Sequence, residues 1–147
     1  MQKKWSSIVK KNFNEAALTY NESASIQKST ALTLAKICSN HSIKQGLWVD
    51  LGSGTGLLAN SLEALHPNQN VIRLDNSQKM IDQHSEKSIK QLWNLNNGLP
   101  KWSEKPNLLA SSFVLHWLDN PQKQLKEWFN SLSSNGWIAL AISINDS

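Results

Sequence analysis

Apolar residues along this chain follow two kinds of spacing that alternate with each other. Helical spacing, with apolar residues three and four positions apart, predicts helices near residues 9–20, 26–38, 57–65, 77–84 and 125–132. Short runs of mostly apolar residues, typical of strands buried on both faces, predict strands near residues 47–49, 71–74, 89–93, 108–112 and 137–144. In the second helix, the residues expected to face inward are Ile26, Leu34, Ile37 and Cys38.

Strands that alternate with helices favour a parallel sheet covered on both faces. Because crossovers between parallel strands are right-handed, the expected fold is a Rossmann-like, doubly wound α/β domain with a mostly parallel, five-stranded sheet. We expect residues 1–45 to form an N-terminal helical cap and residues 46–147 the Rossmann-like domain, the two packed as one compact unit.

The composition indicates the number of domains and the cellular compartment. The 147 residues suit one domain, and a single cysteine, Cys38, excludes an internal disulfide framework and favours a reducing compartment. No apolar run approaches the roughly 20 residues that span a bilayer, and the basic N-terminus lacks the apolar core of a signal peptide. We therefore expect a cytoplasmic protein that does not bind membranes.

The net charge of +4 comes almost wholly from lysine, since Arg73 is the only arginine. Nucleic-acid readers rely on arginine and on dense basic stripes, whereas these lysines are mostly scattered. The charge indicates a solvated surface or an acidic partner, and we expect no nucleic acid partner.

The most informative segment is residues 49–56, with the sequence VDLGSGTG between a strand and a helix. Glycines there let a ligand approach the backbone, and Asp50 stands two positions before the first glycine. A carboxylate at that position repels a pyrophosphate and attracts a cationic ammonium or sulfonium group. The segment thus favours S-adenosylmethionine and disfavours the alternative of an NAD-linked oxidoreductase.

Asp75 ends the second predicted strand, about 20 residues after the glycine turn. A carboxylate there can accept hydrogen bonds from both hydroxyls of a ribose. The alternative is that Asp75 only caps the turn at residues 77–79.

These segments resemble motifs of class I S-adenosylmethionine-dependent methyltransferases. The glycine segment is similar to their first motif, residues 74–81 (LDNSQKMI) to D-x-S-x-x-M-[IL], and residues 111–117 (SSFVLHW) to S-N-x-x-[LF]-[QH]-W. The spacing of Phe13, Ala16, Ala17, Tyr20, Ala24 and Gln27 is similar to the opening of the malonyl-acyl-carrier-protein O-methyltransferases of biotin synthesis. Trans-aconitate and other small-acid methyltransferases share the pattern found at residues 111–117.

The resemblance implies a role for each matching residue. The residues it assigns to the cofactor S-adenosylmethionine are Tyr20, Asp50, Gly52, Ser53, Gly54, Gly56, Asp75, Asn76, Met80 and Asn94. Within this set, Asp50 and the glycine turn hold the methionine part, Asp75 holds the ribose, and Met80 flanks the adenine together with Ile81. Tyr20 helps to close a lid, as Gln27 can if it is not a plain surface residue. His116 and Trp117 line the acceptor mouth, where a structural role for each is the alternative.

The chain also departs from the family pattern. Residues 99–100 match its leucine-proline, but Leu95 or Asn94 occupies the position of an acidic residue that recognises the adenine amino group, and Asn97 stands nearby. An asparagine carbonyl can still accept a hydrogen bond from that amino group.

The expected reaction is in-line methyl transfer to a carboxylate oxygen, which needs no general base at neutral pH. Because the four histidines are dispersed and the cysteine stands alone, we expect no metal site. The expected acceptor is an acidic small molecule, or an acidic group such as malonyl on acyl carrier protein. The alternatives are a methyltransferase for another small acid and a degenerate module that binds the cofactor without transfer.

The length bears on these alternatives. The family fold usually continues with an antiparallel strand pair, so we expect this chain to be a truncated form that stops after the fifth strand. An exposed apolar edge strand favours pairing with another chain, so we expect a reduced enzyme, a fragment, or a partner or dimer that covers this edge.

Overall fold

The computed structural model describes residues 20–143, with side chains described from residue 24 onward. The helix predicted near residues 9–20 therefore lies almost entirely outside the described residues. The elements, in chain order, are α2 (Tyr20–Ser39), β1 (Trp48–Leu51), α3 (Leu57–Leu65), β2 (Val71–Asp75), α4 (Gln78–Ile81), β3 (Lys90–Leu92), the 3-10 helix η2 (Leu95–Asn97), β4 (Leu108–Ser112), the 3-10 helix η3 (Leu115–Trp117), α5 (Pro121–Ser131) and β5 (Trp137–Ala141).

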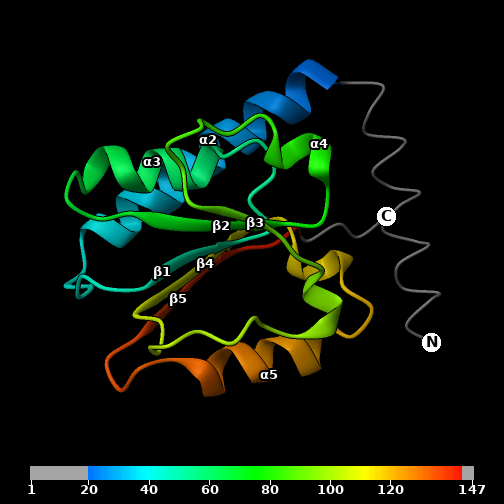
Figure 1. The fold of residues 1–147 in the computed structure, drawn as a ribbon. Helices are drawn as coiled ribbons and strands as arrows, with labels where there is room; N and C mark the ends of the chain where they lie inside the picture. Colours follow the sequence, from blue (N-terminus) through cyan, green and yellow to red (C-terminus); the bar gives the residue numbers. More distant parts are fainter. Residues whose placement is uncertain (1–19, 144–147) are drawn as a thin grey trace.

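The five strands form one sheet in the order β3-β2-β1-β4-β5, and every neighbouring pair is parallel. Helices α2 and α3 cover one face of the sheet and α5 covers the other (Figure 1). This arrangement confirms the predicted doubly wound α/β fold. The chain order reverses between β1 and β4, and the carboxyl ends of strands at such a reversal form the crevice in which ligands bind.

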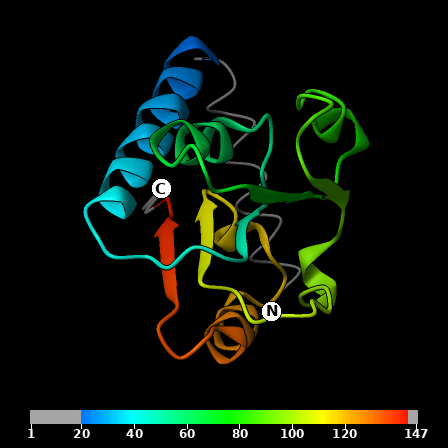
Figure 2. The same ribbon diagram turned by 60° about the vertical axis from the view of Figure 1, so that its left-hand side comes forward.

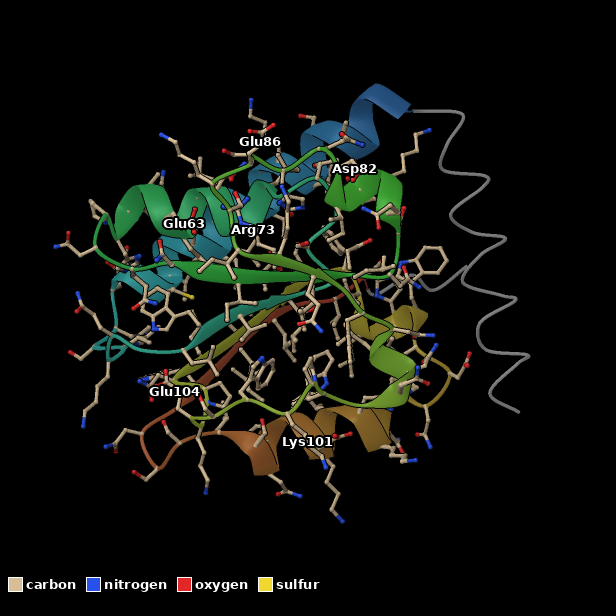
Figure 3. All side chains as sticks on the ribbon, viewed as in Figure 1. Glu63, Arg73, Asp82, Glu86, Lys101 and Glu104 are labelled. Carbon is tan, nitrogen blue, oxygen red and sulfur yellow. The ribbon has the colours of Figure 1, made fainter. Side chains whose placement is uncertain are left out.

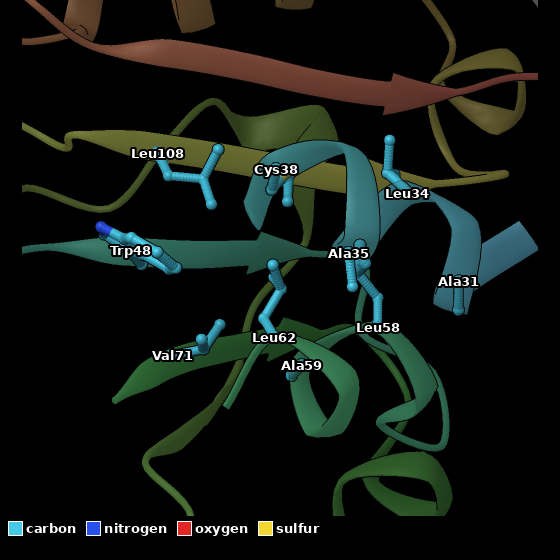
Figure 4. Packing of buried hydrophobic residues seen from close by; sticks show 11 residues of the cluster. Ala31, Leu34, Ala35, Cys38, Trp48, Leu58, Ala59, Leu62, Val71 and Leu108 are labelled. Carbon is cyan, nitrogen blue, oxygen red and sulfur yellow. The ribbon is translucent and has the colours of Figure 1, made fainter. Parts of the chain in front are cut away.

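The strand β1 lies at the centre of the sheet, and Figure 2 shows it with neighbours on both sides. All four of its residues are buried, as expected for a strand covered on both faces. Successive side chains point to opposite faces, so Trp48 packs with Val71 and Leu108 against α2 and α3 (Figure 4). Val49 and Leu51 pack on the α5 side.

The inward face of α2 differs from the one predicted. Leu34 and Cys38 are buried as expected, but Ile26 is 58 % exposed and Ile37 is 49 % exposed. The buried stripe instead runs through Ala31, Leu34, Ala35 and Cys38, a spacing of three and four residues that places both isoleucines on other faces of the helix. The prediction was wrong because small alanines, and not the larger isoleucines, allow α2 to approach α3 and the sheet.

Strand β5 is shorter than the sequence predicts. It pairs with β4 from Trp137 opposite Leu108 to Ala141 opposite Ser112, where β4 ends. Ile142 is half-exposed, and residues 144–147 lie outside the described part. Because β5 is an edge strand, four of its five residues are only partly buried and Trp137 is exposed. Helix α4 likewise ends at Ile81, before the predicted His84.

Within residues 20–143, no helix is both long enough and apolar enough to span a membrane. The thiol of Cys38 lies in the core between α2 and the sheet, and burial raises its pKa to about 11. Such a thiol stays protonated at neutral pH and is unreactive.

Candidate functional site

A cavity of about 720 Å³ opens at the carboxyl ends of β1, β2 and β4, the crevice that the strand order predicts. The sequence-predicted residues that line it are Gln27, Asp50, Gly52, Ser53, Gly54, Asp75, Asn76, Met80, Asn94 and Trp117. Three predicted residues do not line it: Gly56, Ile81 and His116. Tyr20 is the first residue of α2, and its side chain lies outside the described part.

The glycine turn between β1 and α3 bends tightly against the end of β2. The N–H groups of Gly52 and Ser53 both donate to the Leu74 carbonyl, at 2.8 and 2.7 Å. Gly54 has a φ of +54°, and a Cβ added there would meet no atom within 4 Å. The missing side chain of Gly54 therefore leaves open space on the cavity side of the turn.

Asp75 connects this turn to the start of α4. Its Oδ1 accepts a hydrogen bond from the Gly54 N–H at 3.0 Å, and its Oδ2 accepts one from the Ser77 N–H, also at 3.0 Å. Each carboxylate oxygen can accept a further hydrogen bond, and Asp75 lines the cavity. The arrangement thus supports the turn and leaves acceptors for the hydroxyl groups of a ligand, so the two readings of Asp75 are compatible.

Asp50 lies on the α3-facing side of β1 and is 1 % exposed. Neither of its carboxylate oxygens has a hydrogen-bond partner in the described part of the chain, although the Ala59 backbone lies near it. Burial raises the pKa of Asp50 to about 7, against the opposing effect of Arg73 on the neighbouring strand. A buried carboxylate that lacks a partner and lines a cavity is suited to a cationic ligand group.

Gly56 has a packing role in this structure. A Cβ added there would lie 2.8 Å from Nδ1 of His84 and 3.0 Å from Nη1 of Arg73. Arg73 is 1 % exposed and pairs with Glu63 of α3 at 2.6 Å, and Figure 3 shows this pair between α3 and the sheet. Sequence reasoning missed this cluster, although an arginine within a strand that is otherwise apolar was a signal for it.

The segment after β3 forms the wall beside Met80. Asn94 caps η2, because its Oδ1 accepts a hydrogen bond from the Asn96 N–H at 2.9 Å. Leu95 is buried below it, while Asn97 does not line the cavity. Trp93 also lines this wall, with its Nε1 donating to the Gly98 carbonyl at 2.8 Å. Sequence reasoning missed Trp93 because it was assigned to a strand.

The segment after β4 forms the opposite wall. Phe113 has a φ of +59°, the left-handed region that side chains rarely adopt, and its N–H donates to the Ala141 carbonyl at 2.7 Å. Val114 packs on the glycine turn, because a Cβ added to Gly52 would lie 2.4 Å from its Cγ2. Trp117 lines the cavity, on the same wall as Phe113 and Val114.

His116 takes a different position from the one expected. It does not line the cavity, and its Nδ1 is buried without a partner among the described residues. Burial lowers the pKa of His116, so the ring is neutral at pH 7. Its ring centroid lies 5.8 Å from that of Trp117, which indicates a packing role beside the cavity wall.

The described lining carries two carboxylates, Asp50 and Asp75, and no lysine, arginine or histidine. A dinucleotide pyrophosphate would face this negative charge without a cation, whereas a ligand with a cationic group and a ribose matches it. Within residues 20–143, no three histidine, cysteine, aspartate or glutamate residues gather to form a metal site.

Comparison with known proteins gives a consistent family match. A family profile described as a methyltransferase domain matches residues 49–140. A malonyl-[acyl-carrier protein] O-methyltransferase of Bacillus cereus is 27 % identical over 134 residues, which cover 88 % of this chain and 50 % of the relative. A trans-aconitate 2-methyltransferase of Mycobacterium tuberculosis is 31 % identical over 99 residues, covering 66 % of this chain and 37 % of the relative.

Among solved structures, the plantazolicin methyltransferase BpumL, in complex with a substrate analog and SAH, matches with a TM-score of 0.76 at 15 % identity. The match covers 95 % of this chain and 58 % of BpumL. An S-adenosylmethionine dependent methyltransferase of Mesorhizobium loti matches with a TM-score of 0.56 at 22 % identity, covering 70 % of this chain and 49 % of the other. These structures share the fold, and the chain spans half or less of the length of the two curated relatives.

Proposed function

The chain belongs to the methyltransferase domain family, and we propose that it binds S-adenosylmethionine and directs its methyl group to a carboxylate oxygen of an acidic acceptor. The family match makes the alternative of an NAD-linked oxidoreductase untenable.

The residues of the cavity fit the parts of S-adenosylmethionine. Asp50, buried and without a partner, would attract the cationic amino acid part, beside the open space at Gly54. Asp75 and Asn76 would hold the ribose, with the two carboxylate oxygens of Asp75 accepting from its hydroxyl groups. When bound, the cofactor supplies a methyl group activated by its sulfonium sulfur.

The adenine would lie between Met80 and the wall of Trp93 and Asn94, all of which line the cavity. The Asn94 carbonyl oxygen already accepts from the Asn96 N–H and keeps a second lone pair for the adenine amino group. A neutral amide contact is weaker than one to a carboxylate, so we propose that shape and stacking contribute more to adenine binding here than charge does.

The wall after β4 favours an acceptor that needs no base, because among the described residues it carries no side chain that could take a proton. Ser112, Phe113, Val114, Trp117 and Leu118 line it, and the neighbouring His116 does not. A carboxylate is already ionised at neutral pH, so the protein needs only to align it and to exclude water. Both curated relatives described above carry acceptor names, malonyl and trans-aconitate, that denote acids with free carboxylates.

Within this class, we propose a malonyl group on acyl carrier protein, as used in biotin synthesis, ahead of a free small acid. The match to the malonyl-[acyl-carrier protein] O-methyltransferase covers 88 % of this chain, against 66 % for the trans-aconitate enzyme. The net charge of +4 suits an acidic carrier protein.

The test is transfer of labelled methyl from S-adenosylmethionine to malonyl-acyl-carrier protein, with trans-aconitate as the second acceptor. A methyl ester formed on malonyl and absent with the Asp75→Ala variant supports the proposal. Transfer only to trans-aconitate would show that the acceptor is a free small acid and not the malonyl group. Cofactor binding with no transfer to either acid would favour a module that binds the cofactor without catalysis.

Two further expectations complete the proposal. The buried, unreactive thiol of Cys38 suits the cytoplasm.

We also propose that a second copy or another partner covers the open edge of β5, where Trp137 is 39 % and Ile142 50 % exposed. Light scattering over a range of concentrations tests this, because a purely monomeric mass at every concentration contradicts self-association.

A further inference from the structure

We propose that His84 is a positioning residue for the cofactor turn, a neutral imidazole that links the Gly54 carbonyl to the Arg73–Glu63 pair, and that protonation of His84 weakens cofactor binding. The inference rests on the proposed binding of S-adenosylmethionine. His84 lies in the turn after α4, away from the cavity lining, and belongs to none of the motifs found in the sequence.

The Gly54 residue is held from both sides. Its N–H donates to Oδ1 of Asp75 at 3.0 Å, and its carbonyl oxygen lies 2.8 Å from Nε2 of His84. Because the following peptide is planar and trans, the N–H of Thr55 points away from His84. Both residues line the cavity, so His84 determines the orientation of a peptide that faces the ligand.

The protonation of His84 follows from its partners. Its Nδ1 lies 3.0 Å from Nη1 of Arg73, and a guanidinium can only donate hydrogen bonds. Nδ1 must therefore accept, which places the single ring proton on Nε2, where it is donated to the Gly54 carbonyl. The Ser53 hydroxyl, at 3.3 Å, is a weaker second contact of the same nitrogen.

Arg73 cannot move aside to accommodate a second ring proton. It is 1 % exposed, and Nη2 is 2.6 Å from Oε1 of Glu63, whose other oxygen accepts from the Val71 N–H at 2.9 Å. A protonated Nδ1 would point a donor at this fixed cation. The ring would have to turn or leave, and the Gly54 carbonyl would lose its donor.

The surroundings of His84 both lower and raise its pKa. Burial is the largest effect and lowers the pKa of His84; Arg73 on β2 and Lys90 on β3 act in the same sense, while the Gly54 carbonyl and Asp75 oppose them. The Lys90 ammonium also lies 3.3 Å from the His84 carbonyl. Burial raises the pKa of Asp50, on β1 beside Arg73, to about 7, so this carboxyl is a second group whose protonation changes between pH 5 and 8.

The experiment measures S-adenosylhomocysteine binding by calorimetry from pH 5 to 8 for the full chain and three variants. Glutamine can donate to Gly54 and accept from Arg73 without titrating, so His84→Gln should retain binding and lack the low-pH loss attributed to His84. His84→Ala should bind about tenfold more weakly at pH 8, the effect of one buried hydrogen bond. His41→Gln, a matched change at an exposed histidine, should behave as the parent chain does.

Protonation of Asp50 should also lower the affinity for S-adenosylhomocysteine as the pH falls. That loss of affinity persists in His84→Gln, so the comparison with the parent chain separates it from the loss caused by His84. If His84→Ala fails to fold, the Gln variant and the imidazole nitrogen signals of the parent chain still test the proposal. Those signals must show a pyridine-like Nδ1 and a protonated Nε2 at pH 7 without ligand.

The opposite tautomer, or parent-like affinity and pH dependence in both His84 variants, overturns the proposal. Absence of any binding to the parent chain at pH 8 overturns the proposed function instead, because the tautomer measurement needs no cofactor.

Discussion

The two walls of the cavity are built in different ways. At the β1 and β2 ends, polar groups of the turn are fixed by hydrogen bonds: the Gly54 N–H donates to Asp75, and the Gly54 carbonyl accepts from His84. At the β4 end, the wall consists mainly of Phe113, Val114 and Trp117, with Ser112 as its small polar residue. The first wall presents fixed carboxylates, and the second presents apolar and aromatic surface.

The difference indicates that the first wall binds the cofactor and the second aligns the acceptor. Fixed dipoles and charges recognise one invariant ligand, because they lose little freedom when it binds. An apolar wall excludes water and constrains an acceptor by shape, which suits the alignment of a nucleophile that needs no base. We expect changes on the first wall to alter cofactor affinity and changes on the second to alter acceptor use, and the predictions below test that separation.

The largest effect is expected where the two walls touch. Gly52→Ala places a Cβ 2.4 Å from Cγ2 of Val114 at a φ of +78°, so it should lower the free energy of unfolding by about 3 kcal/mol. Urea unfolding measures this. Adding Val114→Ala should recover about half of the loss, and Gly54→Ala, with open space, should cost only about 1 kcal/mol. Equal losses at both glycines would contradict the contact.

Asp75→Ala tests the cofactor wall directly. It removes two acceptors of backbone N–H groups and the proposed ribose ligand, so S-adenosylhomocysteine affinity should fall about 100-fold, as for lost hydrogen bonds to a charged group. Calorimetry at pH 8 measures this affinity. The control is Asp82→Ala, which changes an exposed aspartate at the C-terminal end of α4. A change below threefold would remove Asp75 from the site.

Asp50→Asn should separate binding from stability. S-adenosylmethionine affinity should fall about tenfold as a charge partner is lost, while the melting temperature at pH 8 should rise by about 3 °C.

The sign of this stability change follows from the pKa of Asp50. The value in the folded chain, about 7, lies above the ordinary 3.8, so the folded state loses stability as the pH rises through 7. The gain in the Asn variant should therefore vanish below about pH 4. A lower melting temperature of Asp50→Asn at pH 8 would show that the Asp50 charge stabilises the unliganded protein.

The smallest effect on cofactor binding is expected on the β4 wall. Phe113→Gly removes a half-buried ring but relieves a φ of +59°, so stability should change by less than about 1 kcal/mol. S-adenosylhomocysteine affinity should change less than about threefold, while the KM for the acceptor rises. Steady-state kinetics with labelled cofactor checks this, and a large loss of cofactor affinity would break the proposed division.

Sequence reasoning succeeded where one local segment carries the information. The alternation of apolar runs and helical spacing predicted the five strands of the sheet, and the local motifs picked out the glycine turn, Asp50 and Asp75, all of which line the cavity. It failed where several segments had to be combined. The burial of Ala31 and Ala35 in place of Ile26 and Ile37 depends on how closely α2 packs on α3, which α2 alone does not specify.

By itself, then, the sequence determined the parallel α/β order and the carboxylate-flanked glycine turn, because hydrophobic periodicity and turn chemistry are local properties. Only the tertiary structure placed Arg73, Glu63 and His84 together behind that turn, assigned Gly56 to packing against them, and turned His116 away from the cavity. These outcomes depend on which side chains from distant segments share one buried volume, and a linear pattern does not encode distances between segments.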